Sequence, residues 1–163
     1  MRAFLVIILV GVTAALTIVI RIPIPGTGGY MNVGDIAVVF CGLFLGRKYG
    51  ALAGGVGSAI ADIIGGFFIF APVTLVAKSL EGFIAGTIGF SKLKYYLMPL
   101  AGLSMVAVYF ISETFMPGMG IAAAASELPF NVIQAFVGAY GGLLVYGGVI
   151  KALPKAGQSL LNR

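Results

Sequence analysis

Seven polar side chains that could bind a ligand lie within otherwise apolar stretches of this sequence. They are five ionisable residues and two amides: Asp35, Asp62, Lys78, Glu81, Glu113, Asn131 and Gln134. Where such stretches cross a bilayer, a charge at the centre costs roughly 2.5–3.5 kcal/mol on insertion scales, so each group needs a partner or a function. Because the carboxylates outnumber the lysine, we expect a ligand that is neutral or cationic and rich in hydrogen-bond donors.

The sequence offers no catalytic or metal-binding set. It contains no histidine, which is the commonest general base and metal ligand. Its single cysteine, Cys41, lies in an apolar run without zinc-type spacing, so we expect a buried structural thiol. The stretch GGVGSAIAD lacks the Gly-Lys-Ser/Thr ending of a phosphate-binding loop. We therefore expect no enzymatic activity, no ATP hydrolysis by this chain, no metal site and no cofactor.

The composition is that of an integral membrane protein. Of 163 residues, 60% are hydrophobic and only 9% are charged, whereas about a quarter of the residues in soluble domains are charged. Apolar stretches of spanning length recur along the chain, which predicts one all-α membrane domain over residues 1–163. Transmembrane strands would be runs of about 10 residues with alternating polarity, and these runs are longer and continuous. We explain the net charge of +5 by membrane orientation and expect no nucleic-acid binding.

Glycine, proline and basic clusters divide the chain into six predicted transmembrane helices. Their approximate ranges are residues 3–20, 33–46, 48–66, 71–90, 95–115 and 127–151. The first stretch exceeds the ~7–15 apolar residues of a signal peptide, so we interpret it as a retained span. Basic residues fall mostly on one side of this arrangement: Arg2, Arg47, Lys48, Lys92, Lys94, Lys151, Lys155 and Arg163. Only Arg21 falls in a loop on the other side, so the positive-inside rule predicts cytoplasmic N- and C-termini.

The polar residues within the predicted spans share one depth. At ~1.5 Å per residue, Lys78 lies roughly 10 Å and Glu81 about 15 Å from the outer end of their helix. The other five also fall in the outer halves of their helices. This arrangement predicts a pocket open to the exterior rather than a pore across the bilayer. Four aromatic residues of the outer loops could stack on a flat ring: Tyr30, Phe67, Phe68 and Phe70.

Purely structural roles are also open for these residues. Lys78 and Glu81, three positions apart, could simply neutralise each other. Asp35 could be only a favourable anion at a helix start, and Asp62 could bond a neighbouring helix. The two amides serve a ligand or an interhelical bond equally well. We interpret Glu127, which follows Ser126 at the predicted start of the last helix, as part of a helix cap.

Small residues recur every four positions along the third predicted helix, at Gly50, Gly54, Ser58, Asp62 and Gly66. Such spacing allows close helix contact in lipid, and we expect internal packing for most of these residues. The first helix carries Gly11 and Ala15 at the same spacing among bulky residues. We expect these two residues to dock onto a partner protein.

Two stretches of the sequence resemble a known family. YMNVGDIAVVFCGLFLGRKYGALAGGVGSAIADIIGG and FAPVTLVAKSLEGFIAG are similar to the substrate-binding S components of energy-coupling factor (ECF) vitamin transporters. The resemblance is strongest over residues 30–86 and elsewhere rests on helix count and length. It implies a vitamin pocket in the outer half, capped by the loop of residues 21–32. It also implies docking onto a membrane coupling subunit driven by two ATPase subunits, in the plasma membrane of a prokaryote.

The resemblance also suggests site residues and a ligand. Asn32 and Asp35 match the start of the second helix in the family, Lys78 and Glu81 match its fourth-helix motif, and the two amides fit by position. With the residues of the outer half, the predicted substrate site comprises Tyr30, Asn32, Asp35, Asp62, Lys78, Glu81, Glu113, Asn131 and Gln134. This branch resembles members that handle hydroxymethylpyrimidine, a thiamine precursor, or pyridoxine. Riboflavin is the alternative ligand, and a stand-alone secondary transporter is the alternative function, although no convincing internal repeat supports it.

Overall fold

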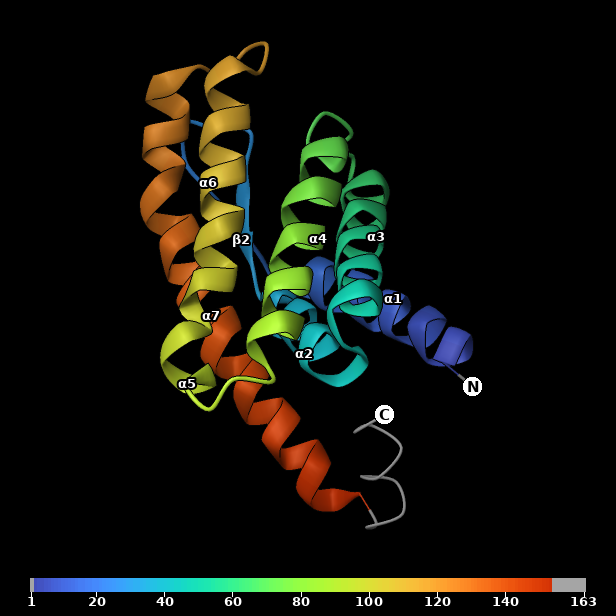
Figure 1. Ribbon diagram of the computed structural model, residues 1–163. Coiled ribbons are helices and arrows are strands. Elements are labelled where there is room, and N and C mark those ends of the chain that lie inside the picture. Colours follow the sequence, from blue (N-terminus) through green and yellow to red (C-terminus); the bar gives the residue numbers. More distant parts are fainter. Residues whose placement is uncertain (1, 154–163) are drawn as a thin grey trace.

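The computed structural model describes residues 2–153, and it places most of them in helices. Six long helices form the bundle: α1 (Arg2–Val19), α2 (Gly34–Leu45), α3 (Arg47–Gly65), α4 (Ala71–Ile88), α6 (Pro99–Phe115) and α7 (Ile121–Ala152). A single turn, α5 (Lys94–Leu97), precedes α6. The all-α prediction is confirmed in its main feature (Figure 1). Lys155 and Arg163, which contributed to the predicted charge asymmetry, lie outside the described residues.

Two helical segments, Lys94–Phe115 and Ile121–Ala152, are long and apolar enough to cross a membrane by length and composition. The apolar helices over Ala3–Val19 and Gly34–Leu45 are shorter. Six spans and cytoplasmic termini therefore stay predictions. The connections from α2 to α3 and from α4 to α6 lie at one end of the bundle, together with the end of α7 (Figure 1).

Two helix boundaries differ from the predictions. The last helix begins at Ile121 rather than near residue 127, because a run of four alanines, strong helix formers, extends it toward the N-terminus. Pro129 is accommodated inside this helix. The predicted helix over residues 95–115 is divided at Met98, which ends α5 and precedes Pro99, the first residue of α6. Proline is well tolerated at a first helical position because its missing N–H would have no helical partner there.

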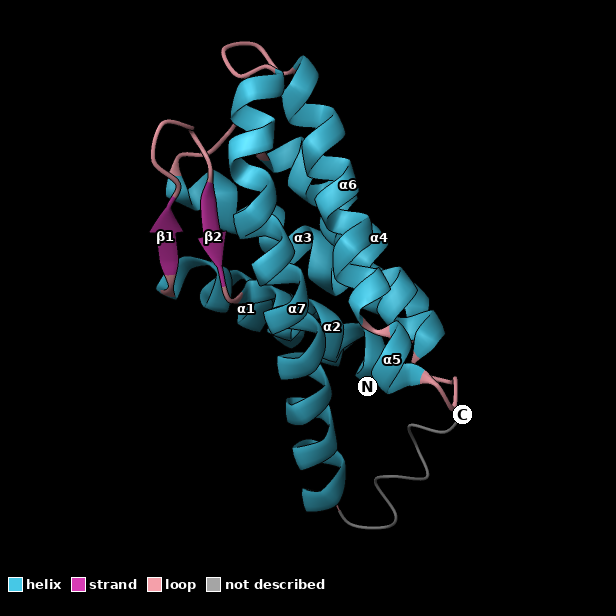
Figure 2. Cartoon of the chain, turned by 90° about the vertical axis from the view of Figure 1, so that its left-hand side faces the viewer, coloured by secondary structure: helices cyan, strands magenta, loops and turns pink. Residues whose placement is uncertain are grey.

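A short β-hairpin follows α1 within the loop predicted to be a lid. Its strands are β1 (Arg21–Pro23) and β2 (Tyr30–Asn32), which pair antiparallel with Arg21 opposite Asn32 and Pro23 opposite Tyr30. Gly26, at φ 78°, supplies a backbone conformation in the turn that other residues rarely adopt. Figure 2 shows the hairpin on the flank of the bundle beside α7, and β2 contacts both α1 and α7.

Glycines let the central helices approach to backbone contact. A Cβ atom on Gly82 of α4 would lie 2.6 Å from the carbonyl oxygen of Gly50 in α3. A Cβ atom on Gly42 of α2 would lie 2.6 Å from the carbonyl oxygen of Gly82. The predicted internal packing of the small residues in α3 is thus confirmed for Gly50, and a Cβ atom on Gly54 would likewise meet Val38 of α2.

Buried apolar clusters hold the bundle together. Val39, Ala85, Ala101, Ala139 and Leu143 join α2, α4, α6 and α7 in one of them. A second cluster joins α1, α2 and α3 and includes Cys41, which is fully buried as predicted. These clusters fix the helices that carry the polar side chains described next.

Candidate functional site

The β-hairpin is fastened to the bundle by Arg21 and Tyr30. The Arg21 guanidinium donates to the Ala61 carbonyl oxygen at 2.6 Å and lies 4.7 Å from the centre of the Tyr30 ring. Tyr30 packs against Phe67, with ring centroids 4.6 Å apart, and its hydroxyl donates to the carboxylate of Asp62 in α3. Burial and the neighbouring Asp62 carboxylate raise the pKa of Tyr30 well above its ordinary value, so the phenol stays a hydrogen-bond donor.

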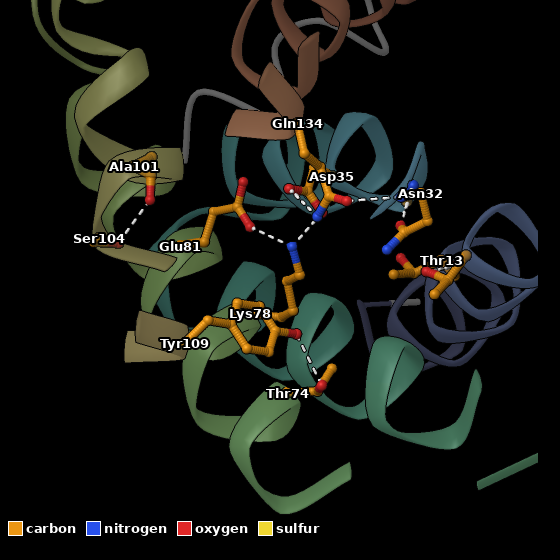
Figure 3. A network of polar contacts seen from close by, with 12 residues as sticks. Thr13, Asn32, Asp35, Thr74, Lys78, Glu81, Ala101, Ser104, Tyr109 and Gln134 are labelled. Atoms are coloured by element: carbon orange, nitrogen blue, oxygen red, sulfur yellow. Dashed lines mark hydrogen bonds and ion pairs between the residues drawn. The ribbon is translucent and has the colours of Figure 1, made fainter. Parts of the chain in front are cut away.

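Lys78 is the centre of a buried ionic network between α2 and α4. Its ammonium group donates to Asp35 and lies 3.4 Å from Glu81 (Figure 3). These three side chains are exposed by only 2%, 1% and 0%, respectively. Gln134 of α7 donates to Asp35 at 3.1 Å and accepts the backbone N–H of Asn32 at 2.7 Å. The network thus ties the end of the hairpin to three helices.

Asp35 lies in the first turn of α2, where an anion is favourable, but its contacts go beyond that role. Its carboxylate contacts Lys78 and Gln134, and no side-chain cap bond is present at the start of α2. The Asn32 side chain instead accepts the Gly34 N–H at 2.7 Å. The mutual neutralisation of Lys78 and Glu81 is present, but it is part of a network that also includes the α2 carboxylate.

A pocket lies between the hairpin and the helices, and it encloses about 410 Å³ including its open mouth. Most of its lining residues carry a polar group, and they come from the hairpin, α1, α3, α4, α6, α7 and the residue before α4. The lining residues are Thr17, Gly29, Tyr30, Asn32, Ser58, Asp62, Phe70, Thr74, Lys78, Tyr109, Glu113, Glu127, Asn131 and Gln134.

Four buried polar atoms of this lining have no hydrogen-bond partner. They are Ser58 Oγ, Asp62 Oδ2, Glu113 Oε2 and Glu127 Oε1. Buried polar atoms are almost always satisfied in folded proteins, and leaving one unpaired costs about 1–3 kcal/mol. The convergence of four such atoms on one pocket indicates a space built for a polar ligand.

Comparison with known proteins identifies the kind of protein that carries this pocket. The sequence profile of the family described as "ECF-type riboflavin transporter, S component" matches residues 3–152. The chain belongs to this family. An S component is the substrate-binding subunit of a vitamin-uptake transporter and not an enzyme.

Two related proteins align with most of the sequence of this S component. An "Uncharacterized protein in gap 3'region" of Pyrococcus woesei is 36% identical over 143 residues, which span 85% of this chain and 92% of that protein. The "Thiamine precursor transporter HmpT" of Lactococcus lactis subsp. cremoris (strain MG1363) is 30% identical over 135 residues, which span 80% of this chain and 78% of that protein.

The S component brings seven of the nine predicted site residues to the pocket wall: Tyr30, Asn32, Asp62, Lys78, Glu113, Asn131 and Gln134. The other two, Asp35 and Glu81, do not line it and instead contact the ammonium group of Lys78. Of the outer-loop aromatic residues, Phe70 lines the pocket, whereas Phe68 is exposed.

Glu127 is the main correction to the sequence analysis. The helix-cap interpretation is wrong because α7 begins at Ile121, which places Glu127 on the second turn. Its side chain is buried and lines the pocket together with Glu113. Ser58, Thr74 and Tyr109 were also missed; hydroxyl residues in apolar helices carry no charge that would single them out in sequence.

Proposed function

We propose that this S component binds a small, water-soluble vitamin precursor in the polar pocket beneath the β-hairpin. Hydroxymethylpyrimidine and pyridoxine are the leading ligands. The observation that carries the proposal is the set of four unpartnered, buried polar atoms that converge on one pocket. Each of these atoms gains a partner when a ligand rich in hydrogen-bond donors enters, which makes binding favourable relative to the empty site.

The lining favours these small heterocycles over riboflavin. Among residues 2–153, the lining contains one purely hydrocarbon side chain, that of Phe70, and hydroxyl, amide or charged groups end most of the other lining side chains. Riboflavin would bring a large fused ring with an apolar edge, whereas a substituted pyrimidine or pyridine offers polar groups around a single ring to these side chains. The name of the Lactococcus relative agrees with a thiamine precursor. The description of the matching family keeps riboflavin as the second candidate.

Delivery of the ligand requires partners in this proposal. A membrane coupling subunit and two ATPase subunits would drive uptake, in the plasma membrane of a prokaryote. Gly11 and Ala15 are exposed on α1, and a Cβ atom on Gly11 would meet nothing within 4 Å. Such a small-residue surface suits close contact with another membrane helix, so we place the docking face there.

Calorimetry on the purified full chain in detergent tests the proposal. The titrants are hydroxymethylpyrimidine, pyridoxine, thiamine and riboflavin, and we expect saturable binding of one of the first two. Failure of every water-soluble vitamin to bind contradicts the proposal. Ion-gradient-driven uptake by vesicles that hold this protein alone would favour the secondary transporter instead.

A further inference from the structure

Two acidic side chains meet in the pocket without a cation. Glu113 of α6 and Glu127 of α7 are exposed by only 1% and 3%, and their carboxyl groups interact directly. Each has one oxygen without a hydrogen-bond partner. Within residues 2–153, the ion pairs that the structure contains are those of Lys78 with Asp35 and Glu81, so no basic side chain is paired with these two carboxyls.

Two adjacent buried carboxyl groups offer hydrogen-bond acceptors to the pocket, and each has an oxygen atom that no donor of the described residues satisfies. An exocyclic amine on a heterocycle carries two N–H donors, one for each carboxyl group. Leaving a buried acceptor unpaired is costly, so a ligand with such an amine is favoured over one without it.

We propose that Glu113 and Glu127 form a specificity subsite that binds the amine-bearing edge of an amino-substituted heterocycle. This inference rests on the proposed function and narrows its ligand class. Pyridoxine, which has hydroxyl groups in place of an exocyclic amine, satisfies the pair less well. Riboflavin lacks a free exocyclic amine as well.

The hairpin contributes to the same subsite through Gly29. A Cβ atom at this position would collide with the carboxyl group of Glu127, with 2.5 Å to its Cδ atom. The backbone at Gly29 does not have a positive φ, so the requirement for glycine comes from space alone. The hairpin backbone therefore lies directly against the Glu127 carboxyl group, which helps to separate an amine bound there from water and strengthens its hydrogen bonds.

A matched pair of ligands tests the subsite on the wild-type chain. The first is hydroxymethylpyrimidine, and the second is the same molecule with hydrogen in place of the exocyclic amine. Removing hydrogen bonds to a charged group reduces affinity by about 10- to 100-fold. We expect the amine-bearing compound to bind more tightly by this factor in calorimetry on the full chain in detergent.

Substitutions then test whether the two glutamates cause the preference for the amine-bearing ligand. Glu113→Gln and Glu127→Gln should each reduce it to within about threefold, because the amide replaces one carboxyl oxygen by an NH₂ group, which cannot accept from the amine. Thr114→Ala and Ser126→Ala are matched controls: each neighbours one carboxyl, each hydroxyl bonds a carbonyl of its own helix, and neither residue lines the pocket. The controls should keep the full preference.

The outcomes separate this inference from the proposed function. Equal binding of the two ligands by the wild-type chain overturns the subsite while leaving the vitamin-binding function intact. A folded Glu113→Gln variant that keeps the full preference also overturns it. No binding of any vitamin overturns the function and the subsite together. The comparison of the two ligands on the wild-type chain tests the subsite even if a glutamine variant fails to fold.

Discussion

Substitutions in the Lys78 network test which charge controls its stability. Lys78 faces two carboxylates, so the network carries one more negative than positive charge when all three groups are ionised. At 3.4 Å, the attraction between Lys78 and Glu81 amounts to about 5 kcal/mol at an effective dielectric constant of about 20. Glu81 can thus hold Lys78 in its charged form when Asp35 is neutralised.

The two obvious variants should therefore differ in stability. Asp35→Asn removes one charge-assisted hydrogen bond and leaves a one-to-one ion pair, so we expect a loss of about 1.5–3 kcal/mol in the free energy of unfolding. Lys78→Met leaves two buried carboxylates without a cation, so we expect a loss of about 3–5 kcal/mol. The double variant should lose less than the sum, because the two residues interact directly.

The single cysteine supplies the assay. Cys41 is fully buried, so its reaction with a thiol-reactive fluorophore reports unfolding in detergent across a denaturant series. Thr87→Ala is a control on α4, the helix that carries Lys78. The Thr87 hydroxyl lies at an exposed position and donates to the Phe83 carbonyl oxygen. This account of the network would be refuted if Asp35→Asn lowered the free energy of unfolding by as much as Lys78→Met or more. Strict additivity in the double variant would refute it as well.

Three further changes test the hairpin, the helix packing and the docking face. Tyr30→Phe removes the hydroxyl bond to Asp62 and should speed ligand release by about 10-fold in stopped-flow measurements, with the fold unchanged. The raised pKa of Tyr30 means that the unfolded chain ionises first, so native stability should fall as pH rises above about 10, and this slope should flatten in Tyr30→Phe. Gly82→Leu places a side chain against the backbone of α3 and should cost at least about 1–3 kcal/mol of stability in the Cys41 assay. Gly11→Leu with Ala15→Leu should keep vitamin binding but abolish uptake in cells that hold the coupling module; normal uptake would exclude this face from docking.

Depth along a helix could be predicted from sequence, because a constant rise per residue converts position into distance. This reasoning grouped Lys78, Glu113 and Gln134 in one layer, and the structure brings all three to one pocket. The side chains that contact one another within this layer could not be predicted in the same way. Lys78 contacts the α2 carboxylate because α2 packs beside α4 through glycines, a contact between segments more than 40 residues apart.

Glu127 illustrates a different limit. Serine followed by glutamate ahead of a proline is typical of a helix start, so a local rule assigned the residue to a cap. The alanine run before it continues the helix, and only the paired placement of α6 and α7 shows that Glu127 faces Glu113. The sequence thus indicated that carboxylates would outnumber cations in the pocket, but it omitted Glu127 and included Asp35 and Glu81, which do not line the pocket.

If the proposed function holds, the separation of polar and apolar layers limits how a ligand could be delivered. The pocket and its unpartnered polar atoms lie beneath the hairpin, whereas Val39, Met98, Ala101 and Leu143 close the bundle with tightly packed apolar side chains. A polar heterocycle that crossed this layer would lose its hydrogen bonds to the pocket and gain none in return. Release to the other side therefore requires either that these contacts open or that the whole subunit moves within the bilayer. Opening the packed core would cost its burial energy, so the proposed function predicts movement of the subunit with its proposed coupling partner rather than passage through this layer.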